Sequence, residues 1–334
     1  MASSLLVGID GSERSIAAAR WAVRHAHLIA RAVAGETPTG APDAAEPAAD
    51  VEPAADAEPA PADVEPAPAD AAPAEPAPTV TLLYVLDKKF ADAAGIALEE
   101  VDGLTHDAFE RVIDACREED PTVTVVTTTA IGEPAEAIAR LAASHAAVVV
   151  GSHHGATIGE VVGGAIGLRI SVQTNTPTIV VPADWTAGSE PADGRVLVAV
   201  GPDEVSERAV AVGTGLALAS GLPLELMSAW GLPTVLSAPA KAMGGGLDPV
   251  GEQMQHELNA RVDAISAAHP GLRVTGRAVE GPSPAKVLID EARGATVLVM
   301  GTHGRSALGR AVFGSVTHGV LQGLVVPTAI VPQA

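Results

Sequence analysis

Aromatic residues, cysteine and cations are all scarce in this chain. Phenylalanine, tryptophan and tyrosine make up only 2% of its 334 residues, so its cores must be built from Ala, Val, Leu and Ile, as in a parallel sheet covered by helices. Cys116 is the only cysteine, so no disulfide can form within the chain, and we expect a small apolar residue on a helix face rather than a reactive thiol. The 20 Lys and Arg against 41 Asp and Glu give a net charge of −21, which excludes nucleic acid and anionic membranes as partners.

Long hydrophobic runs are also missing. The apolar segment at residues 1–7 is too short for the core of a signal peptide before Asp10 interrupts it. No apolar stretch of about 18 residues is free of polar breaks, which predicts no transmembrane helix. Together with the single cysteine, these absences favour a protein of the reducing cytoplasm.

The chain contains two copies of one unit. Residues 148–153 align with 298–303, and residues 177–182 align with 327–332 at the same spacing. The first strands of the copies lie further apart, so the first copy carries an insertion. We therefore predict two domains, a first copy at 1–183 and a second copy at 194–334.

The insertion is the Ala/Pro/Asp/Glu tract from about Gly35 to Pro78. It has almost no side chain able to join a core, and between Pro42 and Pro78 it carries acids and no base. Such a composition predicts a disordered, low-complexity segment that interrupts the first domain. A passive insertion is favoured over a motif that recruits a partner, which stays as the alternative.

Hydrophobic patterning predicts alternating strands and helices in both copies, hence an α/β fold with two tandem, doubly wound, five-stranded parallel sheets. The expected strands are 5–9, 80–86, 122–128, 147–150 and 178–181 in the first copy and 195–200, 223–229, 273–279, 296–300 and 328–331 in the second. The expected helices are 12–32, 98–118, 134–144 and 164–173, followed by 206–219, 249–268, 284–293 and 314–322.

A glycine-rich loop follows the strand at 296–300. Gly301, Gly304 and Gly314 are followed by the hydroxyl residues Ser315 and Thr317. Glycines after a strand let the backbone approach a phosphate, and the free N–H groups at the start of the next helix point at it. The spacing is neither G-x-x-x-x-G-K-[ST] nor G-x-G-x-x-G. The loop therefore predicts a phosphate cradle of another type, with a plain βα turn as the alternative.

The pattern G-x2-G-x9-G-[ST] resembles the ATP-binding motif of the universal stress protein family, here in a tandem two-domain form. Arg305, the apolar residues 311–313 and the helix start at 314–317 share this likeness, which covers almost the whole chain outside the insertion and the joining segment. The resemblance implies a flavodoxin-like (Rossmann-like) strand order of 3-2-1-4-5. It also implies ATP as the ligand, with or without Mg²⁺, at the carboxyl ends of strands 1 and 4, and roles in stress survival and signalling.

The two copies keep different parts of this motif. In the family an aspartate at the end of strand 1 contacts the adenine; Asp10 matches it, and we expect it to be buried beside a groove, with a helix-capping Asx turn as the alternative. The first copy has His154 in place of the second motif glycine and Ala165 in place of the hydroxyl. The second copy has the complete loop, but Gly201 stands where the aspartate belongs.

We therefore expect the second copy to bind the nucleotide. The candidate binding residues are Val200, Gly201, Met300, Gly301, His303, Gly304, Arg305, Gly314, Ser315, Val316 and Thr317 in the second copy, and Asp10, Gly151 and Gly164 in the first.

No catalytic residue is predicted, because no general base, lysine or metal-binding carboxylate pair accompanies the loop; only slow ATP hydrolysis stays open. His153, His154, His303 and His318 match no metal-ligand spacing. The alternatives are a scaffold whose sites have decayed and a nucleotidyl enzyme.

We expect the apolar last strands, 178–181 and 328–331, to pair the two copies like a dimer, since they would otherwise be open edges. The resemblance implies that contact in single-domain relatives; a further homodimer stays open.

Overall fold

The computed structural model describes residues 4–34, 77–95, 98–152, 165–201, 205–231, 248–302 and 315–333. All of them belong to one of the chain's two compact units, formed by Met1–Glu36 and Ala77–Ala334. The predicted disorder of the acidic insertion falls almost wholly outside the described residues. Among the described helices, none is both long and apolar enough to cross a membrane.

Strands and helices alternate along the described chain, as the sequence predicts. The first copy contains β1 (Ser4–Ile9), α1 (Glu13–Ala34), β2 (Thr79–Asp87), α2 (Lys88–Ala94), α3 (Leu98–Glu119), β3 (Thr124–Gly132), α4 (Pro134–Ala142), β4 (Ala147–Gly151), α5 (Ala165–Ser171) and β5 (Thr178–Val181). The second contains β6 (Val196–Ala199), α6 (Val205–Ser220), β7 (Leu224–Trp230), α8 (Asp248–Ala268), β8 (Val274–Glu280), α9 (Pro284–Ala292), β9 (Val297–Thr302), α10 (Ser315–Gln322) and β10 (Thr328–Pro332).

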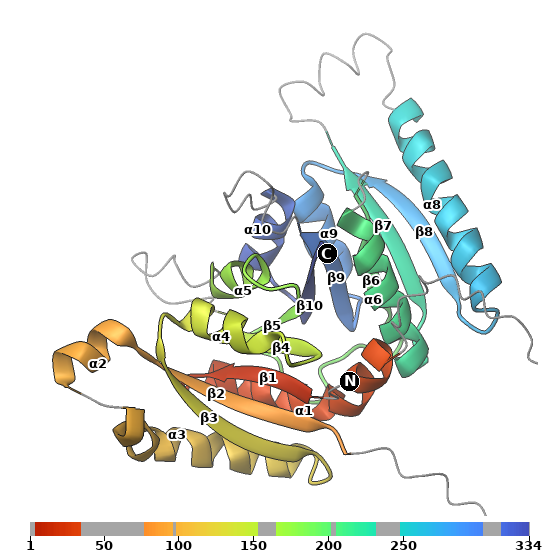
Figure 1. The fold of residues 1–334 in the computed structure, drawn as a ribbon. Helices are drawn as coiled ribbons and strands as arrows, with labels where there is room; N and C mark the ends of the chain where they lie inside the picture. The colour runs from red at the N-terminus through yellow and green to blue at the C-terminus, as the bar shows by residue number, and fades with distance from the viewer. Residues whose placement is uncertain are drawn as a thin grey trace, which may run out of the picture. The chain divides into compact units, whose positions relative to one another are not determined.

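The strands form one ten-stranded sheet in the order β3-β2-β1-β4-β5-β10-β9-β6-β7-β8 (Figure 1). Each copy by itself has the expected order 3-2-1-4-5, and its neighbouring strands run parallel. The copies meet where β5 pairs antiparallel with β10, Ile179 facing Ala329. The expected pairing of the last strands is thus confirmed, and it makes the two five-stranded sheets one continuous sheet.

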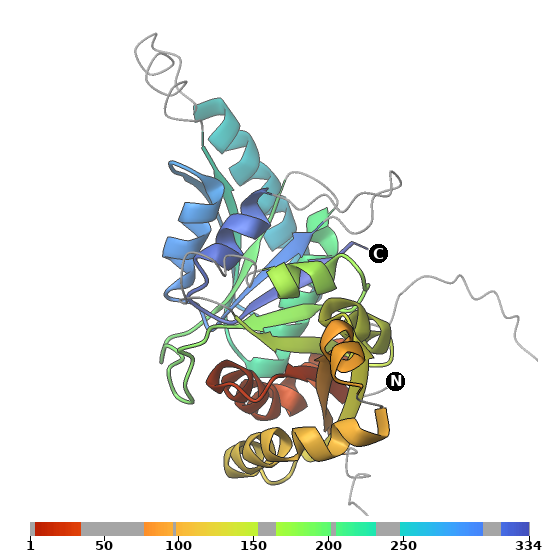
Figure 2. The same cartoon turned by 90° about the vertical axis from the view of Figure 1, so that its left-hand side faces the viewer.

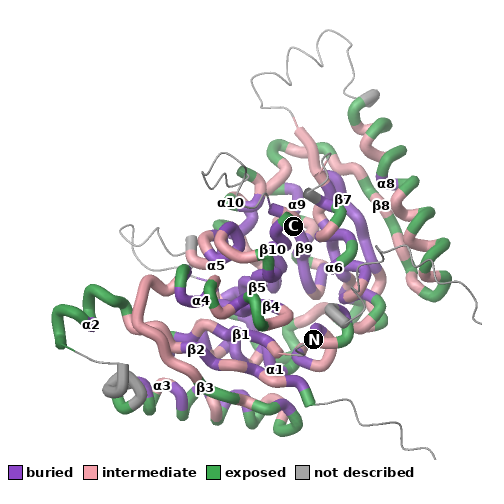
Figure 3. Tube along the Cα trace, viewed as in Figure 1, coloured by how far each residue is buried: buried purple, intermediate pink, exposed green. Residues whose placement is uncertain are grey.

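Helices cover both faces of this sheet, so the fold is doubly wound. Buried side chains of α1, α3, α6 and α8 pack into one apolar cluster, and those of α4, α5, α9 and α10 pack into the other. Figures 1 and 2 show α3 and α8 at opposite ends of the row of strands, beside the edge strands β3 and β8. The inner strands are mostly buried, whereas the edge strands β3 and β8 have no buried residue and the outer sides of α3 and α8 are exposed (Figure 3).

The core is aliphatic, as the shortage of aromatic residues predicts. Its largest fully buried side chains are Leu5, Leu6, Leu82, Leu83, Ile170, Leu197, Leu224, Leu226, Met227, Leu258, Leu298 and Ile330. Cys116 on α3 is completely buried, and this burial raises the pKa of its thiol to about 12. The thiolate, which is the reactive form, is therefore suppressed, in agreement with the expected structural role.

Helices also join the two copies. A Cβ atom on Gly215 of α6 would lie 2.9 Å from the backbone oxygen of Ala32 in α1, so the glycine permits a close helix contact. The Arg208 guanidinium, also on α6, donates hydrogen bonds to the backbone oxygens of Asn175 (2.7 Å) and Pro332 (2.8 Å). The second copy is thus bonded to the first through α6 as well as through the sheet.

A histidine lies at this junction. His25 stacks on Trp21 at 4.5 Å between ring centroids and meets Trp185 edge-on at 6.5 Å. Its Nδ1–H donates to the Trp21 backbone oxygen at 2.8 Å, and its ring lines a cavity of about 40 Å³ between α1, α6, β5 and β10. Loss of water around the ring lowers the pKa of His25, although that hydrogen bond and Glu190 oppose the change.

Acid is therefore expected to weaken the fold through His25. Because the pKa of His25 is lower in the folded chain than the ordinary histidine value of 6.5, the unfolded chain binds the proton more readily, and stability falls as the pH drops below about 6.5. His25→Phe keeps an aromatic ring and removes the titration. Urea midpoints measured at about pH 7.5 and about pH 5.5 should fall less in His25→Phe than in the wild type. An equal fall of the urea midpoint in both proteins would show that His25 is not responsible for the pH dependence. His256→Phe on α8 is the control substitution.

Two elements differ most from the sequence prediction, whereas the ends of the others lie within two residues of the predicted ends. Helix α2 was not predicted; the Asp87 carboxylate caps it by accepting the N–H groups of Lys89 (2.8 Å) and Phe90 (3.3 Å). Strand β3 begins later than predicted, because the Asp120 carboxylate accepts hydrogen bonds from the backbone N–H and the hydroxyl of Thr122 and holds that residue in a turn. The strand also ends later, at Gly132.

Candidate functional site

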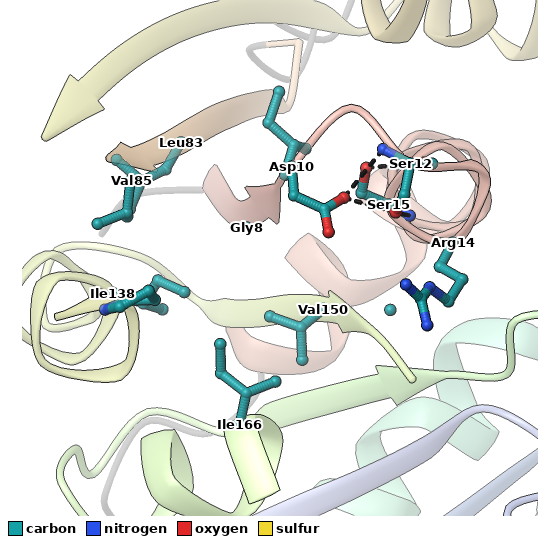
Figure 4. Close-up of a pocket in the computed structure, with 13 residues that line it drawn as sticks. Gly8, Asp10, Ser12, Arg14, Ser15, Leu83, Val85, Ile138, Val150 and Ile166 are labelled. Carbon is teal, nitrogen blue, oxygen red and sulfur yellow. Dashed lines mark hydrogen bonds between the residues drawn. The ribbon is translucent and has the colours of Figure 1, made fainter. Parts of the chain in front are cut away.

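A cavity of about 230 Å³ opens at the carboxyl ends of β1 and β4, the point where the strand order of the first copy reverses. Open α/β sheets bind their ligands at such a switch point. The cavity is lined by Gly8, Ile9, Asp10, Ser12, Arg14, Ser15, Leu83, Val85, Pro134, Ile138, Val150, Gly151 and Ile166 (Figure 4). Two of the three site residues predicted in the first copy, Asp10 and Gly151, are among them; Gly164 lies outside the described residues.

One side of the cavity is apolar. It is built from β2, α4, β4 and α5, which contribute Leu83, Val85, Ile138, Val150 and Ile166. Gly8 in β1 keeps this side open, because a Cβ atom there would lie 3.1 Å from Ile138 Cδ1 and 3.2 Å from Val150 Cγ1. A surface of this kind suits the apolar or aromatic part of a small ligand.

The other side is polar and is organised by Asp10. Its Oδ1 accepts hydrogen bonds from the Ser12 backbone N–H (2.9 Å) and the Ser12 hydroxyl (2.5 Å). The Ser12 Oγ in turn lies 3.4 Å from the Ser15 N–H, near the start of α1. The Asx turn that the sequence offered as an alternative therefore exists, although Asp10 also lines the cavity. The expectation of a buried carboxylate was wrong: Asp10 is exposed, because the turn directs it outward from the end of β1.

Gly151 contacts α1 closely. A Cβ atom at Gly151 would lie only 2.6 Å from the backbone oxygen of Arg14 and 3.2 Å from Arg14 Cβ. This glycine is therefore required for the first turn of α1 to reach the end of β4. The requirement holds with no ligand present, so Gly151 alone is not a sign of phosphate binding.

The second copy places its described candidates at the corresponding edge. Val200 and Gly201 follow β6, Met300 and Gly301 belong to β9, and β6 pairs with β9. The Gly201 N–H donates to the Ser206 hydroxyl of α6 at 2.7 Å. Ser315, Val316 and Thr317 form the first turn of α10, where Thr317 is buried. The other four predictions, His303, Gly304, Arg305 and Gly314, lie outside the described residues.

Sequence reasoning missed Gly8, Arg14 and Ser15 as cavity residues. A glycine inside an apolar strand was a usable signal for Gly8, since strands rarely place one there without a close contact. Arg14 lies in the first turn of the helix predicted at 12–32, directly after the strand predicted at 5–9, so it belongs at the same strand end as Asp10. The predicted aspartate could thus have led to Arg14.

Of the four histidines considered as metal ligands, the structure describes only His318. His318 lies on α10, where Gln322 Nε2 donates to its Nε2 at 3.0 Å. The part of the chain that the structure describes contains no group of three or more His, Cys, Asp or Glu arranged to hold a metal ion. The other three, His153, His154 and His303, lie outside it.

Known proteins resemble the chain in sequence and in fold. The model of the family described as "Universal stress protein family" matches residues 69–182 and 194–332. A universal stress protein of Mycobacterium tuberculosis is 29% identical over 189 residues, 56% of this chain and 62% of the relative. One from Mycolicibacterium smegmatis is 26% identical over 231 residues, 66% of this chain and 74% of the relative. The match with the first thus spans about three fifths of its length.

Solved structures share the architecture. The crystal structure of a universal stress protein from Archaeoglobus fulgidus superposes over all of both chains with a TM-score of 0.66, at 14% sequence identity. At that identity the likeness concerns the fold alone.

Proposed function

The chain belongs to the universal stress protein family, and from this membership we propose that it is an ATP-binding regulatory protein of the stress response, without dedicated catalysis and located in the cytoplasm. Family membership supports the stress-response role. The cavity at the carboxyl ends of β1 and β4 is the observation that supports the proposed nucleotide binding.

The chemistry of the cavity suits part of a nucleotide. Apolar side chains line one side, while Asp10 stands on the other as an acceptor for an exocyclic amine. The volume of about 230 Å³ is below the roughly 300–1,000 Å³ of sites that enclose a whole ligand. A base with its ribose is therefore the part we expect inside, with phosphates at the rim.

A second nucleotide site is proposed in the second copy on the basis of its sequence. The glycine motif of this copy is complete in sequence. The loop begins at Gly301, near the end of β9, and ends at Ser315, the first residue of α10. We propose that this loop holds the phosphates of a second nucleotide, as the expected stronger site. Gly304→Val tests it, because a branched side chain would block the approach of the backbone to phosphate.

Freshly purified protein provides the first test. Heat denaturation followed by chromatography of the supernatant should release ATP or another nucleotide, and labelled ATP should be retained with at most slow release of ADP. Fast Mg²⁺-dependent turnover would contradict a regulatory protein. No released nucleotide, together with no binding in titration, would favour the decayed scaffold.

Asp10 provides a sharper test in the first copy. In a Gly304→Val background, Asp10→Ala should weaken adenine nucleotide binding about ten- to hundredfold by calorimetry, the effect of losing one hydrogen bond to a charged group. Asp10→Asn keeps an acceptor for the Ser12 turn and should show whether the turn or the charge matters. The control Asp114→Ala removes an exposed carboxylate on α3 and should leave affinity unchanged. Equal affinities in all four proteins would exclude Asp10 from the site.

A further inference from the structure

We propose that Arg14 recognises the phosphate of the ligand in the first-copy cavity, and that this cavity takes a nucleoside monophosphate in preference to a triphosphate. The inference rests on the proposed nucleotide binding and names the ligand class of that site. It follows from where Arg14 is held, from its lack of a partner and from the residue in its place in the second copy.

Arg14 is held at the rim of the cavity by its backbone. It belongs to the first turn of α1, and its backbone oxygen and Cβ pack against Gly151 at the end of β4. The side chain lines the cavity together with Asp10 and is half-buried. Figure 4 shows Arg14 and Ile138 on opposite sides of the cavity. A base packed against the apolar side would therefore direct its 5′ substituent toward the guanidinium.

The Arg14 guanidinium is available for a ligand. Two neighbours on α1 are engaged with α3: Arg20 with Glu118 at 2.8 Å and Arg24 with Glu119 at 2.5 Å. No hydrogen bond or ion pair joins the Arg14 side chain to another residue among those the structure describes. A guanidinium presents five donors in a fork that matches the oxygens of a phosphate.

The second copy shows that this cation is not a requirement of the fold. Gly201 stands in the place of Asp10, and the buried Ser206 stands in the place of the buried Ser15. In this alignment the residue matching Arg14 is Val205. The first copy, whose loop has His154 and Ala165 in place of a glycine and a hydroxyl, is thus the copy that has the cation. Arg14 supplies a phosphate contact that its loop has lost.

The balance of charge limits the ligand to a short phosphate tail. Among the lining residues that the structure describes, Arg14 is the one cation, and Asp10 is an anion beside it. The chain as a whole carries a net charge of −21. Each phosphate beyond the first adds negative charge, and the described part of the lining has no second cation to meet it, so affinity is expected to fall from AMP to ADP to ATP.

Calorimetric titration of the full chain in the Gly304→Val background tests the proposal with adenosine, AMP and ATP. AMP should bind at least tenfold more tightly than adenosine and more tightly than ATP. Arg14→Gln should lower AMP affinity about ten- to hundredfold, leave adenosine affinity unchanged and so abolish the preference. Arg14→Lys should retain part of it, because the charge remains. Arg140→Gln, an exposed cation on α4 outside the lining, is the matched control and should change nothing.

The outcomes separate the two proposals. If none of the three ligands binds, the proposed nucleotide site in the first copy is wrong, and this inference fails with it. If they bind but Arg14→Gln keeps the preference for AMP over adenosine, nucleotide binding stands and the role of Arg14 is wrong. If ATP binds more tightly than AMP, the proposed ligand class is wrong even where Arg14 contributes. Melting curves of each variant confirm that the fold is retained.

Discussion

Ile330→Ala should lower the free energy of unfolding by about 2–5 kcal/mol. Ile330 is completely buried in β10, where it pairs with Thr178 of β5 on one side and with Met300 of β9 on the other. Truncation removes apolar contacts and leaves a cavity that the sheet cannot close, because strands on both sides fix the backbone. Urea unfolding followed by circular dichroism measures the change.

The position of Ile330 also predicts how the loss of stability is distributed between the two copies. Trp21 belongs to the first copy and Trp230 to the second, so single-tryptophan versions report on each copy separately. Because β10 joins both copies, both midpoints should fall together. Ile330→Val, which removes one methylene, is the control and should cost about 0.5–1.5 kcal/mol. A fall confined to the second copy would mean that the β5–β10 junction does not couple them.

Glu225→Gln should destabilise the second copy by about 2–4 kcal/mol, because it leaves two arginines without their shared carboxylate. Glu225 lies in β7, and its side chain is only 9% exposed. It accepts from Arg277 Nε at 2.5 Å and contacts the Arg195 guanidinium, while Arg277 also reaches Glu291 at 2.7 Å. The hydrogen bond to Glu225 is the main cause that raises the pKa of Arg277. The expected loss is below that for a fully buried pair, since Arg277 is 47% exposed.

Asp290→Asn is the matched control. Its partner Lys286 lies one turn earlier on α9, at 2.9 Å, and both side chains are more than half exposed. Exposed pairs of this kind contribute little, so the unfolding midpoint should barely move. Equal effects of the two substitutions in thermal melts would show that burial of Glu225 does not decide its contribution. The first copy has Thr81 at the equivalent place in β2, so no counterpart of this network should be found there.

Periodicity and repetition in the sequence predicted most of the fold. Apolar runs such as 147–150 and 178–181 are long enough to be buried on both faces of a sheet, and they leave little choice of structure. The strand order was predicted from the family resemblance, because an apolar segment does not by itself indicate which strands lie beside it in the sheet. Helix α2 was missed because seven residues give too little periodicity, and its stability comes from the Asp87 cap and the left-handed Gly95 that ends it.

The candidate site could be predicted only in part. The family resemblance predicted Asp10, and the alignment of the two copies predicted Gly151; both line the cavity. The resemblance did not predict that Asp10 is exposed, since the direction of a side chain after a strand depends on the turn that follows. Nor did the alignment assign Gly151 to helix packing, because a glycine that accommodates a backbone oxygen and one that accommodates a phosphate are identical in sequence.

The junction between β5 and β10 also sets an order of events during synthesis. The partner of Thr178–Val181 is Thr328–Pro332, and the whole second copy lies between them in the chain. At about 5–20 residues per second, a ribosome takes on the order of ten seconds to make that stretch. Throughout this interval the nascent first copy exposes an apolar strand edge, which is a template for pairing with another chain. The β5–β10 pairing that stabilises the finished protein therefore leaves the growing chain at its greatest risk of aggregation until the second copy is complete. A chaperone would be of most use during this interval.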